Sequence, residues 1–145
     1  MNQTTTQLHS TAYVFSQLLS STRRGARLAR LLTVTELRSW GVEPQLTERA
    51  ELIVAELAAN AVFHGYVRGR DFRLGLMQGS TTSPVRVEVT DARGDRLPAL
   101  GRVLDGEGDG GRGLHIVAAL ADRWGAAPYP PSAKTVWAEC GTGRT

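Results

Sequence analysis

Glu56, Asn60 and His64 follow one another at intervals of four residues within the segment ELAANAVFHG. Residues four apart on a helix are neighbours, so these three form one polar stripe on an otherwise apolar segment. A glutamate beside an asparagine supplies oxygen ligands for a hard cation such as Mg²⁺, and the glutamate can also act as a general base. The solvent-facing side of an ordinary helix gives a similar stripe, although an asparagine gains little there.

Two later segments carry further polar chemistry. Asp91 ends the apolar segment VEVTD just before a turn, where it either shapes the turn or accepts a hydrogen bond from a ligand amine. Residues 108–117, GDGGRGLHIV, are rich in glycine and lead directly into a helical pattern. Such a junction offers backbone N–H groups to phosphate, although glycines that serve only flexibility give the same pattern. Neither the ordinary P-loop nor the dinucleotide-binding glycine pattern is present in the sequence.

Hydrophobic periodicity predicts the elements that position these residues. Helical spacing predicts helices over 22–40, 46–65 and 113–125, with Thr47 as the N-cap of the second helix and Gly65 as its end. Alternation predicts strands over 71–79 and 85–91, and an apolar segment rich in β-formers predicts an opening strand over 11–19. The last two strands are expected over 123–129 and 134–140, joined by a proline-containing turn. This order predicts an α/β two-layer sandwich, with a mixed, mostly antiparallel sheet and helices on one face.

The 145 residues suit one domain, which we place at 11–141 with a glycine-rich lid at 92–112 and tails at 1–10, expected to be disordered, and 142–145. The polar N-terminus is unlike a signal peptide, and a single cysteine fits a reducing compartment, so we expect a cytoplasmic protein. No apolar run reaches the roughly 20 residues of a membrane span. The net charge is only +3 and no block of like charge exists, so we expect no direct nucleic-acid partner.

Together the three segments resemble the sequence boxes of the Bergerat-fold (GHKL) ATP-binding superfamily. ELAANAVFHG is similar to its N box, DARG to its G1 box and GRGLHIV to its G2 box, while KTVWAEC resembles its last core strand. The nearest likeness is to the small stand-alone anti-sigma factors and serine-protein kinases of bacteria, whose first helix resembles ARLARLLTVTELRSWGV. The resemblance extends from about residue 12 to residue 140.

The resemblance implies a site for ATP and Mg²⁺. Asn60 would hold Mg²⁺ at the phosphates, Asp91 would accept a hydrogen bond from the adenine amine, and Glu56 would take a proton from a partner's serine or threonine hydroxyl. The other implied nucleotide-binding residues are Gly94, Gly111, Arg112, Gly113, Leu114 and Thr135. The implied function is a protein serine/threonine kinase and anti-sigma factor that phosphorylates an antagonist protein, sequesters a sigma factor and forms a homodimer.

Departures from the family pattern leave a second function open. The G1 box is usually D-x-G-x-G, but Arg93 and Asp95 replace its glycines, and Gly94 between them could restore the turn. The lid adds negative charge near the expected phosphates, which Mg²⁺ or an arginine would have to offset, at Asp105, Glu107 and Asp109. The alternative function is a nucleotide-binding anti-sigma or adaptor clamp with little or no kinase activity.

Overall fold

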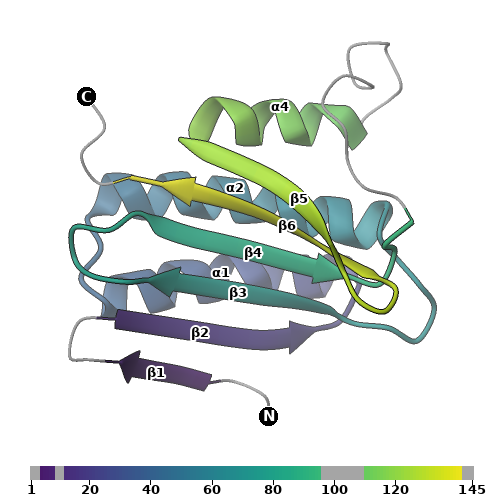
Figure 1. The fold of residues 1–145 in the computed structure, drawn as a ribbon, viewed down its shortest axis with the longest axis horizontal. Helices are drawn as coiled ribbons and strands as arrows, with labels where there is room; N and C mark the ends of the chain where they lie inside the picture. Colours follow the sequence, from purple (N-terminus) through teal and green to yellow (C-terminus); the bar gives the residue numbers. More distant parts are fainter. Residues whose placement is uncertain (1–3, 9–11, 96–109, 142–145) are drawn as a thin grey trace.

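The computed structural model describes residues 4–8, 12–95 and 110–141, which form a six-stranded sheet with helices on one face (Figure 1). The strands are β1 (Thr4–Leu8), β2 (Ala12–Leu19), β3 (Phe72–Gln78), β4 (Val85–Asp91), β5 (Arg123–Tyr129) and β6 (Ala133–Cys140). The helices are α1 (Arg23–Ser39), α2 (Pro44–Phe63) and α4 (Gly110–Leu120). Within these residues, no helix is long and apolar enough to cross a bilayer.

The strand order is β1-β2-β3-β4-β6-β5, and each neighbouring pair is antiparallel. The predicted two-layer α/β sandwich is therefore confirmed, although the described sheet is antiparallel throughout rather than mixed. Alternate residues of the central strands point toward the helices and are buried, because successive side chains of a strand point to opposite faces. The core between sheet and helices includes Phe15, Leu37, Ile53, Leu57, Leu74, Val87 and Val136.

Local sequence explains where the first two helices begin and end. The Thr22 hydroxyl caps α1 by accepting a hydrogen bond from the backbone N–H of Gly25 at 3.1 Å. Gly41 follows α1 with φ of 80°, a conformation that glycine adopts freely. The predicted Thr47 N-cap of α2 is wrong, because Pro44 starts that helix after Glu43. Proline has a preset φ and no N–H, which suits the first helical position, so Thr47 is already within the helix and buried.

Two other boundaries differ from the prediction. Residues 1–10 were expected to be a disordered tail, but Thr4–Leu8 form β1 against β2. The helix expected over 113–125 is α4, which begins at Gly110 and ends at Leu120, because Arg123 already belongs to β5. Residues 96–109 of the expected lid lie outside the described residues.

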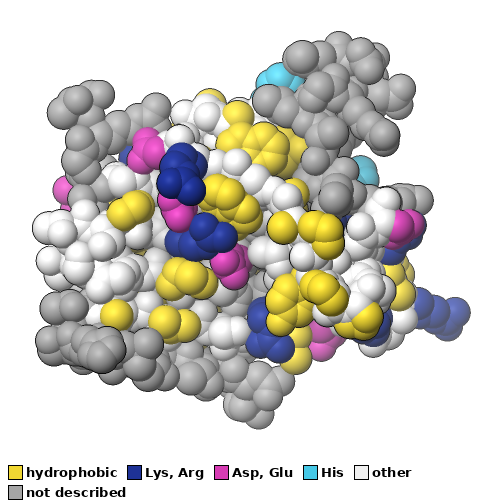
Figure 2. Space-filling view, viewed as in Figure 1, with side chains coloured by type: hydrophobic (Ala, Val, Ile, Leu, Met, Phe, Trp, Pro, Cys, Tyr) yellow, Lys and Arg dark blue, Asp and Glu magenta, His cyan; other side chains and the backbone are white. Residues whose placement is uncertain are grey.

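The face of the sheet opposite the helices carries charged side chains of both signs among apolar ones (Figure 2). On this face Arg86 donates to Glu88 at 2.8 Å and to Glu139 at 3.0 Å. Its guanidinium lies 4.3 Å from the ring centroid of Trp137. Desolvation lowers the pKa of Arg86, but hydrogen bonds and charge interactions with both glutamates together outweigh it, so the pKa is raised. The charges on this face are therefore largely paired with one another.

Candidate functional site

Two of the three residues of the predicted polar stripe, Glu56 and Asn60, lie on the side of α2 that faces α4, whereas His64 is exposed and caps the C-terminus of the helix. The Arg49 guanidinium donates two hydrogen bonds to the carbonyl of Leu120, the last residue of α4, at 2.6 and 3.1 Å. Glu56 and Asn60 lie about two and three helical turns after Arg49, so they occupy the same side of α2. Both residues are half-buried. The structure therefore brings the predicted Glu56 and Asn60 to the side of α2 that α4 covers.

The N-terminus of α4 lies beside the C-terminal half of α2. The two helices run antiparallel, because the end of α4 contacts Arg49 near the start of α2 (Figure 1). The first turn of α4, which begins at Gly110, therefore approaches the level of Asn60. The N–H groups of a helix's first turn have no acceptor within the helix, and with the positive end of the dipole they suit an anion next to the Asn60 side chain.

The predicted residues of α4 are described to different extents. The helix includes Gly111, Arg112 and Gly113, but the Arg112 side chain and the contacts of these three residues lie outside the described part of the structure. The Leu114 side chain is buried, with 2% exposed. Leu114 therefore packs against the protein, and as the fifth residue of α4 its backbone N–H lies beyond the free N–H groups of the first turn.

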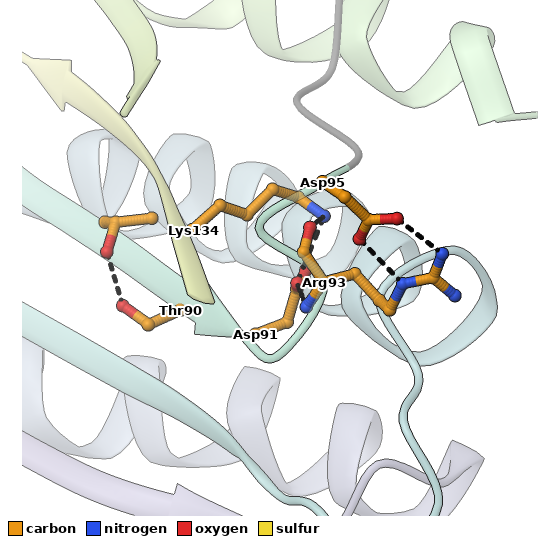
Figure 3. A network of polar contacts seen from close by, with 6 residues as sticks. Thr90, Asp91, Arg93, Asp95 and Lys134 are labelled. Atoms are coloured by element: carbon orange, nitrogen blue, oxygen red, sulfur yellow. Dashed lines mark hydrogen bonds and ion pairs between the residues drawn. The ribbon is translucent and has the colours of Figure 1, made fainter. Parts of the chain in front are cut away.

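Asp91 ends β4 and points toward the helix-covered face, where it pairs with Lys134 of β6 (Figure 3). Lys134 Nζ lies 3.0 Å from Asp91 Oδ1 and 3.2 Å from the carbonyl oxygen of Arg93. The backbone N–H of Arg93 also donates to Asp91 Oδ1, at 2.9 Å. Asp91 and Lys134 are each only 5% exposed, so this is a buried ion pair at the end of the sheet.

Gly65 leaves the space that the Asp91 carboxylate occupies. A Cβ at position 65 would lie 2.1 Å from Asp91 Oδ2 and 2.2 Å from Asp91 Cγ, far inside van der Waals contact. Gly65 follows α2, so the backbone after this helix packs directly against the Asp91 side chain at the end of β4. The sequence analysis assigned Gly65 only the end of a helix, because nothing in its neighbours along the chain indicates the contact with Asp91.

A Gly65→Ala substitution is expected to displace Asp91 and to lower the free energy of unfolding by about 1–3 kcal/mol, the usual cost of overpacking. Urea unfolding followed by tryptophan fluorescence measures this change. Gly75→Ala is the matched control, because the nearest atom to its Cβ would lie at 3.7 Å, an ordinary contact. Equal stability of the two variants would contradict the close packing of Gly65 on Asp91.

Thr135 does not join Asp91. The Thr135 hydroxyl lies 2.7 Å from the hydroxyl of Thr90, its partner in the register of β4 and β6 (Figure 3). Both residues point to the sheet face opposite the helices, because Asp91 and Lys134, one position away on each strand, point toward the helices. Thr135, which the resemblance implies as a nucleotide-binding residue, therefore points away from Asp91, and Lys134 is the β6 residue that lies beside that carboxylate.

The two residues that replace the glycines of the G1 box pair with each other. Arg93 donates through Nε and a terminal nitrogen to the two carboxylate oxygens of Asp95, both at 2.9 Å. Gly94 between them donates its N–H to the carbonyl of Ser132 at 2.8 Å, and a Cβ there would lie 2.5 Å from the carbonyl oxygens of Ser132 and Ala133. Gly94 is therefore required by the close approach of the β5–β6 turn. A positive φ is not the reason, since the described glycines with one are Gly41 and Gly69.

A cleft of about 580 Å³ lies beside this turn, between the segment after β4 and the β5–β6 connection. Its volume suits a small ligand, since such pockets commonly range from about 300 to 1,000 Å³. Its lining residues are Val67, Ala92, Arg93, Gly94, Asp95, Pro128, Tyr129, Pro130, Pro131, Ser132 and Ala133. Asp91 and Asn60 are not among them, so the cleft adjoins the Asp91–Lys134 pair without containing it.

Comparisons with known proteins agree with this arrangement. The family model described as a histidine kinase-like ATPase domain matches residues 19–138. A solved structure, that of the RsbU and RsbW domains of Rv1364c from Mycobacterium tuberculosis, superposes with a TM-score of 0.63 at 18% sequence identity. The alignment covers 88% of this chain but 32% of that one, so this chain corresponds to about a third of the other's length. No curated protein matches the sequence significantly.

Proposed function

This chain belongs to the histidine kinase-like ATPase domain family, and we propose that it is a Mg-dependent protein serine/threonine kinase and anti-sigma factor. In this proposal it phosphorylates an antagonist protein, sequesters a sigma factor and acts in the cytoplasm as a homodimer. The likeness to a structure that contains an RsbW domain supports the fold on which the proposal is built. The observation that carries the proposal is the position of Glu56 and Asn60 on the side of α2 that faces α4, near the N-terminus of that helix.

The side chains present fit Mg²⁺ bound together with ATP phosphates. No cluster of three or more acidic, histidine or cysteine residues converges within the described part of the chain, so the protein alone offers no closed metal cage there. Mg²⁺ usually keeps several waters and binds through one or two protein oxygens plus substrate phosphates. The amide oxygen of Asn60 would supply such a ligand, and the bound ion would neutralise charge on the phosphates.

Each remaining residue then has a separate task. The backbone N–H groups at the start of α4 would bind phosphate oxygens, and Asp91 would accept a hydrogen bond from the adenine amine. Glu56 would take the proton of the partner's hydroxyl while the hydroxyl oxygen bonds to the γ-phosphorus and ADP leaves. Because Glu56 precedes Asn60 by one turn of α2, the base would lie beside the residue that orients the phosphates.

The G1 box favours a second candidate function. The bidentate Arg93–Asp95 pair and the tight contact of Gly94 with the β5–β6 turn occupy the segment that two glycines would otherwise leave open. A protein that binds nucleotide only to hold its own conformation does not transfer phosphate, so it needs no general base. The alternative is therefore an anti-sigma or adaptor clamp that binds nucleotide with little or no transfer of phosphate.

Mg-dependent binding of ATP is the first test. We expect Asn60→Ala to weaken ATP binding about tenfold in the presence of Mg²⁺, because one oxygen ligand of the ion is lost. With a chelator present, wild type and variant should bind ATP equally weakly. Isothermal titration calorimetry under both conditions measures the difference, with Gln45→Ala on an outer surface of α2 as the control. Equal binding by the wild-type protein with and without Mg²⁺ would exclude the role of Asn60.

A further inference from the structure

The Asp91–Lys134 pair presents a hydrogen-bond acceptor and a donor side by side. Asp91 Oδ1 already accepts from Lys134 Nζ and from the backbone N–H of Arg93. Among the described residues Oδ2 accepts no hydrogen bond, and it lies against Gly65, which has no side chain to cover it. One carboxylate oxygen thus fixes the orientation of Asp91, and the other is left for a ligand.

Lys134 has a corresponding spare donor. An ammonium group has three N–H donors. Two of them are directed to Asp91 Oδ1 and to the carbonyl oxygen of Arg93, and the described residues supply no acceptor for the third. The lysine side chain is only 6% exposed, so little water can satisfy this donor. A buried donor without an acceptor is costly, and a ligand atom that accepts from it recovers that cost.

We infer that Lys134 determines base specificity by donating a hydrogen bond to N1 of adenine while Asp91 Oδ2 accepts from the exocyclic amine. The inference rests on the proposed binding of ATP. In adenine the amine donor and the N1 acceptor are adjacent, and they match the adjacent acceptor and donor of the pair. Thr135 cannot serve this role, because it points to the other face of the sheet and bonds to Thr90.

The same arrangement rejects guanine. With the base in this orientation, the O6 acceptor of guanine would face the Asp91 carboxylate, and its N1–H donor would face the Lys134 ammonium. Both hydrogen bonds would be replaced by unpaired or repulsive contacts. Each such mismatch typically weakens binding about five- to a hundredfold, so the two together should make GTP bind at least about 25-fold more weakly than ATP.

The test compares ATP with 1-deaza-ATP, in which a C–H replaces N1. We expect the wild-type protein to bind the analogue about tenfold more weakly. In Lys134→Met the ratio of the two affinities should fall to about one, because the donor is gone. The triphosphate of unsubstituted purine riboside, which lacks the exocyclic amine, should bind weakly to both proteins. Asp91 is intact in each of them, and this ligand has no amine from which it can accept a hydrogen bond. Thr135→Val is the matched control and should keep the wild-type ratio.

The outcomes separate this inference from the proposed function. If the wild-type protein did not bind ATP at all, the result would contradict both the proposed function and this inference. ATP binding with no penalty for 1-deaza-ATP, or with an equal penalty in wild type and Lys134→Met, would overturn the role of Lys134 alone. Comparable affinities for GTP and ATP would also overturn it. If the Lys134→Met protein does not fold, the affinities of the wild-type protein for ATP, 1-deaza-ATP and GTP still test the role of Lys134.

Discussion

A Glu56→Gln variant is expected to transfer phosphate to its partner protein about 10² to 10⁴ times more slowly than the wild type, the usual contribution of a general base. Glutamine keeps the size of the side chain and removes its ability to take a proton. ATP affinity should change little, because Glu56 is assigned neither to binding adenine nor to binding Mg²⁺. Single-turnover transfer of labelled phosphate from ATP, with ATP affinity measured in parallel, tests both expectations.

The control for this experiment lies on the same helix. Glu51 of α2 pairs with Arg30 of α1 at 3.2 Å, on the side away from α4, so Glu51→Gln should transfer phosphate at the wild-type rate. Transfer by Glu56→Gln at the wild-type rate would show that another group takes the proton. If the wild type bound ATP and its partners but transferred no phosphate, the clamp function would replace the kinase.

The elements around the site could be predicted from the sequence because their periodicity is clear. Alternating apolar residues gave β3 and β4 nearly to the residue, and helical spacing gave α1. The first strand, β1, was missed, because the polar segment TTTQL has no apolar face and gains its strand conformation by pairing with β2. Such a strand depends on tertiary contacts that a pattern within one segment does not show.

The polar pairings at the site were harder to predict. The resemblance drew attention to Thr135, but the alternation of Val136 and Ala138 toward the core already places Lys134 on the helix side. Lys134 is also the single lysine of a chain whose other basic residues are arginines. Its partner could not be predicted, because the register of β6 on β4 brings together residues 43 positions apart. The role of Gly65 likewise depends on where α2 ends over the sheet.

An Asp91→Asn variant is expected to lose about 3 kcal/mol of the free energy of unfolding, a large part of the roughly 5–15 kcal/mol typical of a domain. Asparagine keeps the shape and one acceptor but removes the charge that faces Lys134. The lysine is then buried without a counter-charge, which is the main cost of breaking a buried ion pair. Equilibrium unfolding in urea, followed by circular dichroism, measures the loss.

A second substitution identifies the cause of that loss. Replacing the lysine as well, in Asp91→Asn with Lys134→Met, removes the uncompensated charge, so the double variant should be more stable than Asp91→Asn alone. Glu88→Gln is the control, since it breaks a partly exposed pair with Arg86 and should cost less than about 1 kcal/mol. A double variant that is less stable than Asp91→Asn would mean that Lys134 stabilises the fold through contacts other than the carboxylate. Asp91 and Lys134 are also the side chains assigned to adenine. ATP that binds to both should therefore stabilise the wild type against urea more strongly than it stabilises either variant.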